Sequence, residues 1–256
     1  MNIRGAVYKD GKNEWPLRKT LAVSTIINHD PDIIAFQEMQ GENFIYMGDA
    51  LEKYERFQGQ LYDNYHPHSY LSIFWKKDLW DYIDSGGFWL SKTPWRFSSS
   101  WDSNWVRACS WIKLKDKNSK AKIMVMDTHL DYNYPISQQE GVKLILRKAA
   151  SSFIKDIIIL GDFNDQDNSS IRNIMADAGY IDSFKYMKTD SKKESGHAFT
   201  YHRFLGENYS GILTRMDRIL FSSLLKINNF WIIKDRVGEM FPSDHYPIMS
   251  DFQMPL

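Results

Sequence analysis

A short apolar stretch is followed directly by polar side chains that could take part in chemistry. Residues 157–160 are three isoleucines and a leucine, a pattern that predicts a buried strand ending at Gly161. Asp162, Asn164 and Asp165 come next. Polar groups at the end of a buried strand lie on the rim of a sheet, held by a rigid element and facing water. Asp and Asn are also common in ordinary strand-to-loop turns, so this stretch alone leaves both interpretations open.

Similar polar strand ends recur along the chain. Together they supply carboxylates, amides and two imidazoles: Asn2, Glu38, His129, Asp162, Asn164, Asp217, Asp244 and His245. Oxygen-rich ligands without cysteine favour a hard cation such as Mg²⁺ over Zn²⁺. Mg²⁺ usually takes only one or two carboxylates from the protein, and substrate phosphate completes its shell. Two histidines beside carboxylates can donate hydrogen bonds to phosphate or act as general acid and base.

Helices and strands that could position these side chains follow from the apolar periodicity. Helices are predicted over residues 16–28, 42–53, 142–153 and 171–178. Strands are predicted over residues 33–36, 70–75, 106–115, 122–128, 157–160, 198–201, 216–221, 227–233 and 246–252. We expect the strand at 227–233 to pair with the strand at 216–221. Helices alternate with strands early and strands cluster late, which predicts an α/β (α+β) fold of two packed sheets flanked by helices.

The composition limits the kind of protein. The 256 residues include 32 basic and 32 acidic side chains, so the chain lacks the global basic field of a sequence-indifferent nucleic-acid binder. The single cysteine, Cys109, excludes an intrachain disulfide and fits a reducing compartment. No linker, signal region or transmembrane run is visible, which predicts one domain over 1–256. We expect a cytoplasmic monomer; secretion stays open if the start has lost an export signal.

Five short motifs occur in a recognisable order: Gln37-Glu38, Thr128-His129, Gly161-Asp162-Phe163-Asn164, Asp217-Arg218-Ile219 and Ser243-Asp244-His245-Tyr246-Pro247. In this order they resemble the endonuclease/exonuclease/phosphatase superfamily, which includes DNase I, abasic-site endonucleases, deadenylases, neutral sphingomyelinases and inositol-polyphosphate 5-phosphatases. Asn2-Ile3-Arg4, Trp15 with Arg18, and residues 85–94 are similar to a bacterial branch whose substrates are poorly defined. The resemblance runs along essentially the whole chain and implies a DNase I-like four-layer sandwich of two mixed sheets and outer helices.

The resemblance also implies how a metal ion and the attacking water would be held. Glu38 would hold the metal ion, Mg²⁺ with Mn²⁺ as a substitute, and Asn2 and Asp244 would lie near it. Asp162 would orient or deprotonate the attacking water. Asn164 would bond the phosphate. These roles are implied by the resemblance, and the residues alone do not assign them.

Two histidines would contact the phosphate if the resemblance holds. His245 would bind a non-bridging oxygen, and Asp217 would fix its ring. His129 would be the second imidazole. Related enzymes place a glutamate before the strand at 70–75 to pair with the counterpart of His129, and this chain has no glutamate there. Asp131 is an alternative partner for the His129 ring.

Substrate contacts are harder to derive from the sequence. The place of Arg107 in the resemblance suggests a contact with phosphate or substrate, and a surface salt bridge is the alternative. A group of tryptophans could stack a sugar or a base, but we expect core positions for them: Trp89, Trp95, Trp101, Trp105 and Trp111. Specificity would come from loops such as 86–105 and 185–211.

Three functions remain in competition. The first is a divalent-metal-dependent phosphoester hydrolase, a phosphodiesterase or phosphatase, in which activated water attacks phosphorus in line while metal and imidazolium stabilise the developing charge. The second is a magnesium-dependent endonuclease or exonuclease on DNA or RNA. The third is a catalytically inactive binding module of the same fold. A dead scaffold has no chemical need for the complete set of polar strand ends, which disfavours the third, and whether the substrate is a small molecule or a nucleic acid stays open.

Overall fold

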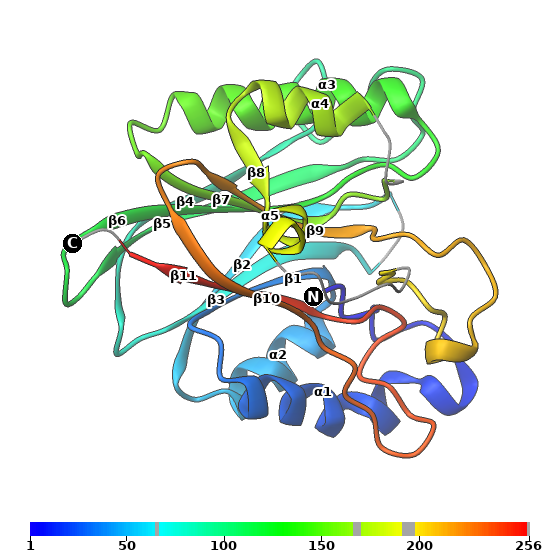
Figure 1. Cartoon of the computed structure of the whole chain (residues 1–256). Helices are drawn as coiled ribbons and strands as arrows, with labels where there is room; N and C mark the ends of the chain where they lie inside the picture. Colours follow the sequence, from blue (N-terminus) through cyan, green and yellow to red (C-terminus); the bar gives the residue numbers. More distant parts are fainter. Residues whose placement is uncertain (65–66, 166–169, 191–197, 255–256) are drawn as a thin grey trace.

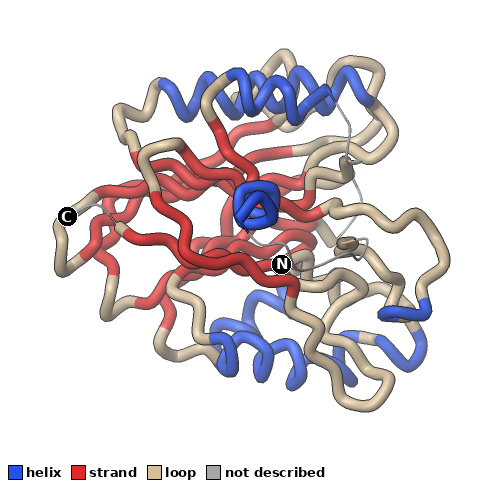
Figure 2. The backbone as a smooth tube through the Cα atoms, viewed as in Figure 1, coloured by secondary structure: helices blue, strands red, loops and turns tan. Residues whose placement is uncertain are grey.

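Four layers of secondary structure make up the described part of the chain, residues 1–64, 67–165, 170–190 and 198–254 of this computed structural model. A six-stranded and a three-stranded sheet pack face to face, and helices cover their outer faces (Figures 1 and 2). The prediction of two sheets flanked by helices is therefore confirmed. Part of the predicted specificity loop at 185–211, residues 191–197, lies outside the described ranges.

The six-stranded sheet is mixed and has the order β4-β5-β6-β7-β9-β8. Its strands are β4 (Trp80–Trp89), β5 (Ala108–Asp116), β6 (Lys122–His129), β7 (Asp156–Asp162), β9 (Asp217–Ser222) and β8 (Tyr180–Asp182). β6 and β7 run parallel and end together, with His129 beside Asp162. β9 runs antiparallel to β7, so Asp217 at its start also lies beside Asp162. The register thus aligns three polar residues in one row across the edge of the sheet.

Two helices, α3 (Pro135–Ala150) and α4 (Ser170–Asp177), cover the outer face of this sheet (Figure 1). α3 is the crossover between the parallel strands β6 and β7, a connection that parallel pairing requires. Apolar side chains of these two helices and of the strands beneath them hold the layer together: Met124, Met126, Val142, Ile145, Ile157, Ile159, Ile171 and Met175.

Among the helices of the described ranges, none is long and apolar enough to cross a lipid bilayer.

The three-stranded sheet has the order β1-β3-β2, formed by β1 (Ile33–Met39), β3 (Ser69–Lys76) and β2 (Tyr54–Tyr62). Its outer face is covered by α1 (Trp15–His29) and α2 (Gly41–Ala50). Between the sheets lies a second apolar layer that includes Ala35, Ile73, Ile112, Leu114, Ile123, Val125, Ile158 and Phe221. The remaining elements are α5 (Ser183–Asp190), the pair β10 (Lys226–Ile232) and β11 (Ile248–Gln253), and two short 3₁₀ helices, η1 (Gly11–Asn13) and η2 (Gly206–Asn208).

An apolar cavity of about 420 Å³ lies inside the sandwich. It is lined by α1, by β1, by β11 and by the six-stranded sheet. On this side β1 meets the amino-terminal segment through an isolated parallel bridge between Asn2 and Gln37. That bridge nevertheless holds Asn2 in place, because the backbone N–H of Gln37 donates to Met1 O at 3.2 Å and that of Ile3 to Gln37 O at 3.0 Å.

Several predictions of local structure are wrong. Residues 198–201 form no strand and have only a single bridge between Tyr201 and His245. β10 pairs with β11, whereas β9 pairs with β7 and β8. Of the five tryptophans expected in the core, only Trp111 is buried, and Trp95 is 78% exposed. Three of these rings, Trp95, Trp101 and Trp105, lie in the loop between β4 and β5.

Gly161 shows how closely β6 and β7 must approach. Its φ is +139°, a conformation that favours glycine. A Cβ atom there would lie 1.9 Å from the backbone oxygen of Thr128. The strand end that carries Asp162 therefore depends on the absence of a side chain at the preceding residue.

We predict that Gly161→Ala lowers the free energy of unfolding by about 3 kcal/mol or more, because both strain and a backbone clash oppose it. Urea denaturation followed by circular dichroism measures this change. Gly41→Ala is the matched control: Gly41 begins α2 and nothing lies within 4 Å of an added Cβ, so this change should be nearly neutral. Equal stability of Gly161→Ala and the wild-type protein would contradict the packing described here.

Candidate active site

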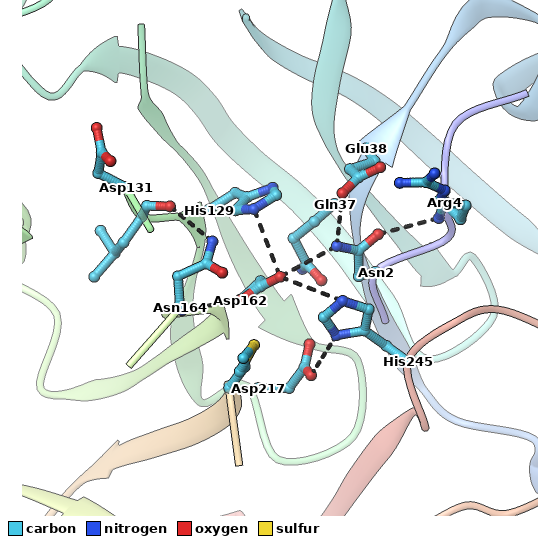
Figure 3. A network of polar contacts seen from close by, with 12 residues as sticks. Asn2, Arg4, Gln37, Glu38, His129, Asp131, Asp162, Asn164, Asp217 and His245 are labelled. Atoms are coloured by element: carbon cyan, nitrogen blue, oxygen red, sulfur yellow. Dashed lines mark hydrogen bonds and ion pairs between the residues drawn. The ribbon is translucent and has the colours of Figure 1, made fainter. Parts of the chain in front are cut away.

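Polar side chains from distant parts of the chain meet at one edge of the two sheets (Figure 3). They come from the ends of β1, β6 and β7, from the start of β9, from the amino-terminal segment and from the loop before β11. The members predicted from sequence that meet here are Asn2, Glu38, His129, Asp162, Asn164, Asp217, Asp244 and His245.

Asp162 lies at the centre of this cluster and is 1% exposed. Its Oδ2 accepts a hydrogen bond from Asn2 Nδ2 at 3.2 Å. The same oxygen is 3.5 Å from His129 Nε2 and 3.8 Å from His245 Nε2. Its Oδ1 accepts from the backbone N–H of Asn164 at 2.9 Å. One carboxylate is thus held by two imidazoles, an amide and the backbone.

His245 is a buried cation. Its Nδ1 lies 2.8 Å from Asp217 Oδ2. Burial alone would lower the pKa of His245, but the charge and hydrogen bond of Asp217 outweigh it and raise the pKa to about 10. Burial would raise the pKa of Asp217, and the charge of His245 lowers it instead. His245 therefore presents a positively charged ring whose Nε2 faces Asp162.

His129 is in the opposite state. Burial, with the charge of Arg107, lowers the pKa of His129 to about 3. Its Nδ1 is 2.9 Å from the hydroxyl of Tyr62. Asp131, the alternative partner considered from sequence, instead accepts hydrogen bonds from the side chain of Ser103 and from the backbone of Asn133. The partner of the His129 ring is therefore a tyrosine at the end of β2.

Glu38 sits at a distortion of β1. Its φ is +58°, and the register between β1 and β3 shifts between Phe36 and Met39. Such bulges re-aim side chains and are common beside active sites. Glu38 Oε1 accepts from Asn2 Nδ2 at 3.0 Å, whereas Oε2 is buried and has no hydrogen-bond partner among the described residues.

The carboxylates of Glu38 and Asp244 lie near each other in the site. Burial and the nearby charge of Asp244 raise the pKa of Glu38. Arg4 Nε is 3.9 Å from Asp244 Oδ2, and the same guanidinium already pairs with Asp10. An unpartnered buried carboxylate oxygen beside a second carboxylate fits a hard divalent cation. The donor set predicted from sequence thus suits a divalent cation chemically.

A second group of possible ligands consists of Asp162, Asp217 and His245, whose ligand atoms lie within 4.8 Å of one another. The Nδ1 atom of His245 is engaged with Asp217, and its ring is cationic. Metal ligation requires a neutral imidazole. The arrangement is therefore better described as a carboxylate–imidazolium pair beside Asp162.

Asn164 and Arg107 lie at the rim of the site. Asn164 Nδ2 donates to the backbone oxygen of Leu130 at 3.0 Å, so its amide nitrogen is already engaged. Arg107 is half-buried, with its guanidinium 5.7 Å from the centre of the Tyr62 ring. Its Nε has no hydrogen-bond partner among the described residues, and no ion pair is seen there for Arg107. The alternative of a surface salt bridge is thus not observed.

Tyr62 and Gln37 belong to the site but were not predicted as site residues from the sequence. Gln37 lies beneath the cluster, and its Nε2 donates to Asp127 Oδ1 at 2.6 Å. The only signal for Gln37 was its place in the motif with Glu38. Tyr62 ends a strand whose polar, half-exposed residues show no clear apolar alternation, so no pattern pointed to it.

A four-layer sandwich with acids and imidazoles gathered at one sheet edge defines the class of DNase I-like proteins. The sequence profile of the Endonuclease/Exonuclease/phosphatase family matches residues 1–245, and the chain belongs to this family. Proteins of this family are generally phosphoester hydrolases. The resemblance stated from five short motifs is therefore confirmed.

Three similar proteins illustrate the relationship. The chain is 26% identical over 99% of its length to the solved endonuclease/exonuclease/phosphatase of Bacteroides vulgatus, covering 97% of that chain with a TM-score of 0.89. It is 24% identical to mannosyl-6-phosphatase of Bacteroides thetaiotaomicron, over 99% of this chain and 97% of that one, with a TM-score of 0.85. It is 26% identical over 198 residues to carbon catabolite repressor protein 4 homolog 3 of Arabidopsis thaliana. This match covers 72% of the chain and spans 39% of the relative's length.

A buried histidine behind the site gives a pH-dependent prediction. His202 is 0% exposed, its backbone N–H donates to Asp244 O at 2.9 Å, and burial lowers its pKa to about 3. The unfolded chain binds a proton near pH 6.5, whereas the folded chain does not. Stability should therefore fall as the pH is lowered from about 6.5 towards 3, by at most about 1.4 kcal/mol per pH unit for this residue.

Urea denaturation at pH 7 and pH 5 tests this effect. We expect His202→Phe to make the loss of stability between these pH values smaller by about 1–2 kcal/mol, because phenylalanine does not titrate. The ring of His202 packs against Phe241 and Tyr246, so an aromatic replacement keeps the contact. Parallel pH dependences for the two proteins would show that His202 is not held neutral.

Proposed function

We propose that the chain is a divalent-metal-dependent phosphoester hydrolase formed by one domain over residues 1–256. The observation that supports this best is the convergence of Asn2, His129 and His245 on the Asp162 carboxylate. A buried carboxylate with two imidazoles beside it can accept a proton from water next to a bound phosphate. Family membership supports the same reaction class.

The proposed reaction is an in-line displacement without a covalent enzyme intermediate. Asp162 orients a water molecule and accepts its proton while the water oxygen attacks phosphorus. The ester oxygen then leaves and takes a proton from solvent. His245 holds a non-bridging oxygen, and Asp217 keeps its ring charged and oriented. Asn164, at the rim, would reach the phosphate through its amide if it releases Leu130.

Glu38 and Asp244 are the proposed ligands of Mg²⁺ or Mn²⁺, with Asn2 fixing the Glu38 carboxylate. The ion would supply a Lewis acid that stabilises charge on the phosphoryl group. The buried, unpartnered Oε2 of Glu38 and its raised pKa support this assignment. Arg107 is proposed as a substrate contact, since its Nε has no partner among the described residues.

A nuclease is the second candidate, and an exposed aromatic group favours it. Trp95 and Phe97 are 78% and 39% exposed in the loop after β4, with the exposed Arg96 between them. Exposed aromatic rings beside an arginine can stack on nucleic-acid bases. The neutral overall charge favours a small phosphorylated substrate instead. Turnover of a plasmid, a ribo-oligonucleotide, sugar phosphates and inositol phosphates in parallel would separate these candidates.

We predict that the protein hydrolyses bis-(p-nitrophenyl) phosphate or p-nitrophenyl phosphate in the presence of Mg²⁺ or Mn²⁺. Asp162→Asn should lower kcat by roughly 10³-fold, because the amide cannot accept the proton of water. Asp177→Asn, an exposed position on α4, is the matched control and should keep full activity. Full activity of Asp162→Asn would refute its assigned role, and absence of turnover on every phosphoester despite bound metal would favour a binding module.

Metal binding gives a separate prediction. Glu38→Gln should weaken Mg²⁺ binding at least roughly tenfold, because it removes a charged oxygen ligand. Isothermal titration calorimetry measures the affinity without any substrate. Glu239→Gln is the control, since Glu239 is an exposed partner of Lys12 and should not alter affinity. An unchanged Mg²⁺ affinity in Glu38→Gln would show that the metal ion does not bind at Glu38.

A further inference from the structure

The hydroxyl of Tyr62 joins two groups of the site. Tyr62 is the last residue of β2 and is 2% exposed. The backbone N–H of Glu38 donates a hydrogen bond to its hydroxyl at 2.9 Å. The same hydroxyl lies 2.9 Å from Nδ1 of His129. A single phenol oxygen thus bridges the backbone of the proposed metal-binding residue and one imidazole.

The direction of these two hydrogen bonds follows from donor chemistry. A backbone N–H can only donate, so the Tyr62 oxygen is the acceptor for Glu38. The hydroxyl proton of Tyr62 then needs an acceptor, and His129 Nδ1 is the only one that the described residues offer it. If His129 Nδ1 carried a proton instead, the Tyr62 oxygen would receive two donors and its own buried proton would have no partner. Buried polar groups without partners are rare because they are costly.

The protonation states of Tyr62 and His129 agree with a hydrogen bond donated by the Tyr62 hydroxyl to His129 Nδ1. A tyrosine phenol ordinarily titrates at about pH 10, so Tyr62 keeps its proton at neutral pH. Burial and Arg107 hold His129 in its uncharged form. A neutral imidazole that accepts at Nδ1 carries its proton at Nε2. That atom is 3.5 Å from Asp162 Oδ2 and faces the centre of the site.

We propose that Tyr62 is a positioning residue that holds His129 as its Nε2–H tautomer, so that His129 serves as an uncharged hydrogen-bond donor towards a bound phosphoryl oxygen. The part of this proposal that concerns substrate rests on the proposed function. His245, paired with a carboxylate, is a charged donor, whereas His129, paired with a phenol, is a neutral one. His129 is therefore not the proton source for the leaving group.

The tautomer can be observed without any substrate. In protein labelled with nitrogen-15 histidine, a ring nitrogen that carries a proton and one that does not differ widely in chemical shift, and His129→Gln identifies the signals of His129. We expect Nε2 to carry the proton and Nδ1 to lack it in the wild-type protein. In Tyr62→Phe we expect a mixture of tautomers. A proton on Nδ1 in the wild-type protein, or an unchanged spectrum in Tyr62→Phe, overturns the proposal.

Kinetics test the role of the donor. Tyr62→Phe should lower kcat roughly tenfold with little change in KM, because one oriented hydrogen bond is lost at the transition state. Tyr54→Phe is the matched control: its hydroxyl donates to Pro31 O, outside the site, and its loss should leave kcat unchanged.

A second pair of variants tests the donor role of His129 even if Tyr62→Phe does not fold. His129→Gln places an uncharged N–H near the position of Nε2 and should keep roughly tenfold more activity than His129→Ala. Equal loss in the glutamine and alanine variants would mean that His129 does not act as an uncharged hydrogen-bond donor, which overturns the proposal. If no phosphoester is hydrolysed, the proposed function fails, whereas the spectra still decide which tautomer Tyr62 holds.

Discussion

A buried carboxylate that needs several partners is the constraint on which the site depends. Asp162 is nearly inaccessible to water, and a charge in such a place is stable only when it is paired and hydrogen-bonded. Its partners come from the amino-terminal segment, the end of β6 and the loop before β11. The parallel pairing of β6 with β7 places His129 beside Asp162, and the antiparallel pairing of β7 with β9 places Asp217, the partner of His245, beside it as well. The sandwich therefore positions the groups that stabilise the buried charge of Asp162.

Two imidazoles at the same carboxylate differ because their second nitrogens have different partners. A carboxylate behind His245 keeps that ring charged, and a phenol behind His129 fits a neutral ring. On the opposite side of Asn2, Arg4 lies 3.9 Å from Asp244, and one Glu38 oxygen has no hydrogen-bond partner among the described residues. Charge pairing is therefore tight between His245 and Asp217 and looser around Glu38. With this asymmetry, a metal ion would bind on the glutamate side, and a phosphate would bind between the two sides.

Much of this arrangement could be predicted from the sequence, because buried strands that end in polar residues leave a strong local signal. The ends of β1, β6 and β7 and the start of β9 were all visible in this way. Tyr62 was not, since β2 is an edge strand with mostly half-exposed residues, and its contact with His129 joins residues 67 positions apart. The pairing of β10 with β11 was missed because a long loop separates them and the nearer strand β9 is occupied on both sides. Partners across the sandwich depend on tertiary packing, which local periodicity does not encode.

The central claim is that one pocket holds both the metal ion and the phosphoryl group. Crystals grown with Mn²⁺ and inorganic phosphate test it most directly, because the anomalous signal of manganese locates the ion independently of the chain. We predict a manganese peak at the carboxylates of Glu38 and Asp244, with phosphate bound between the ion and the ring of His245. A manganese peak at another surface, or phosphate bound away from Asp162, would contradict it.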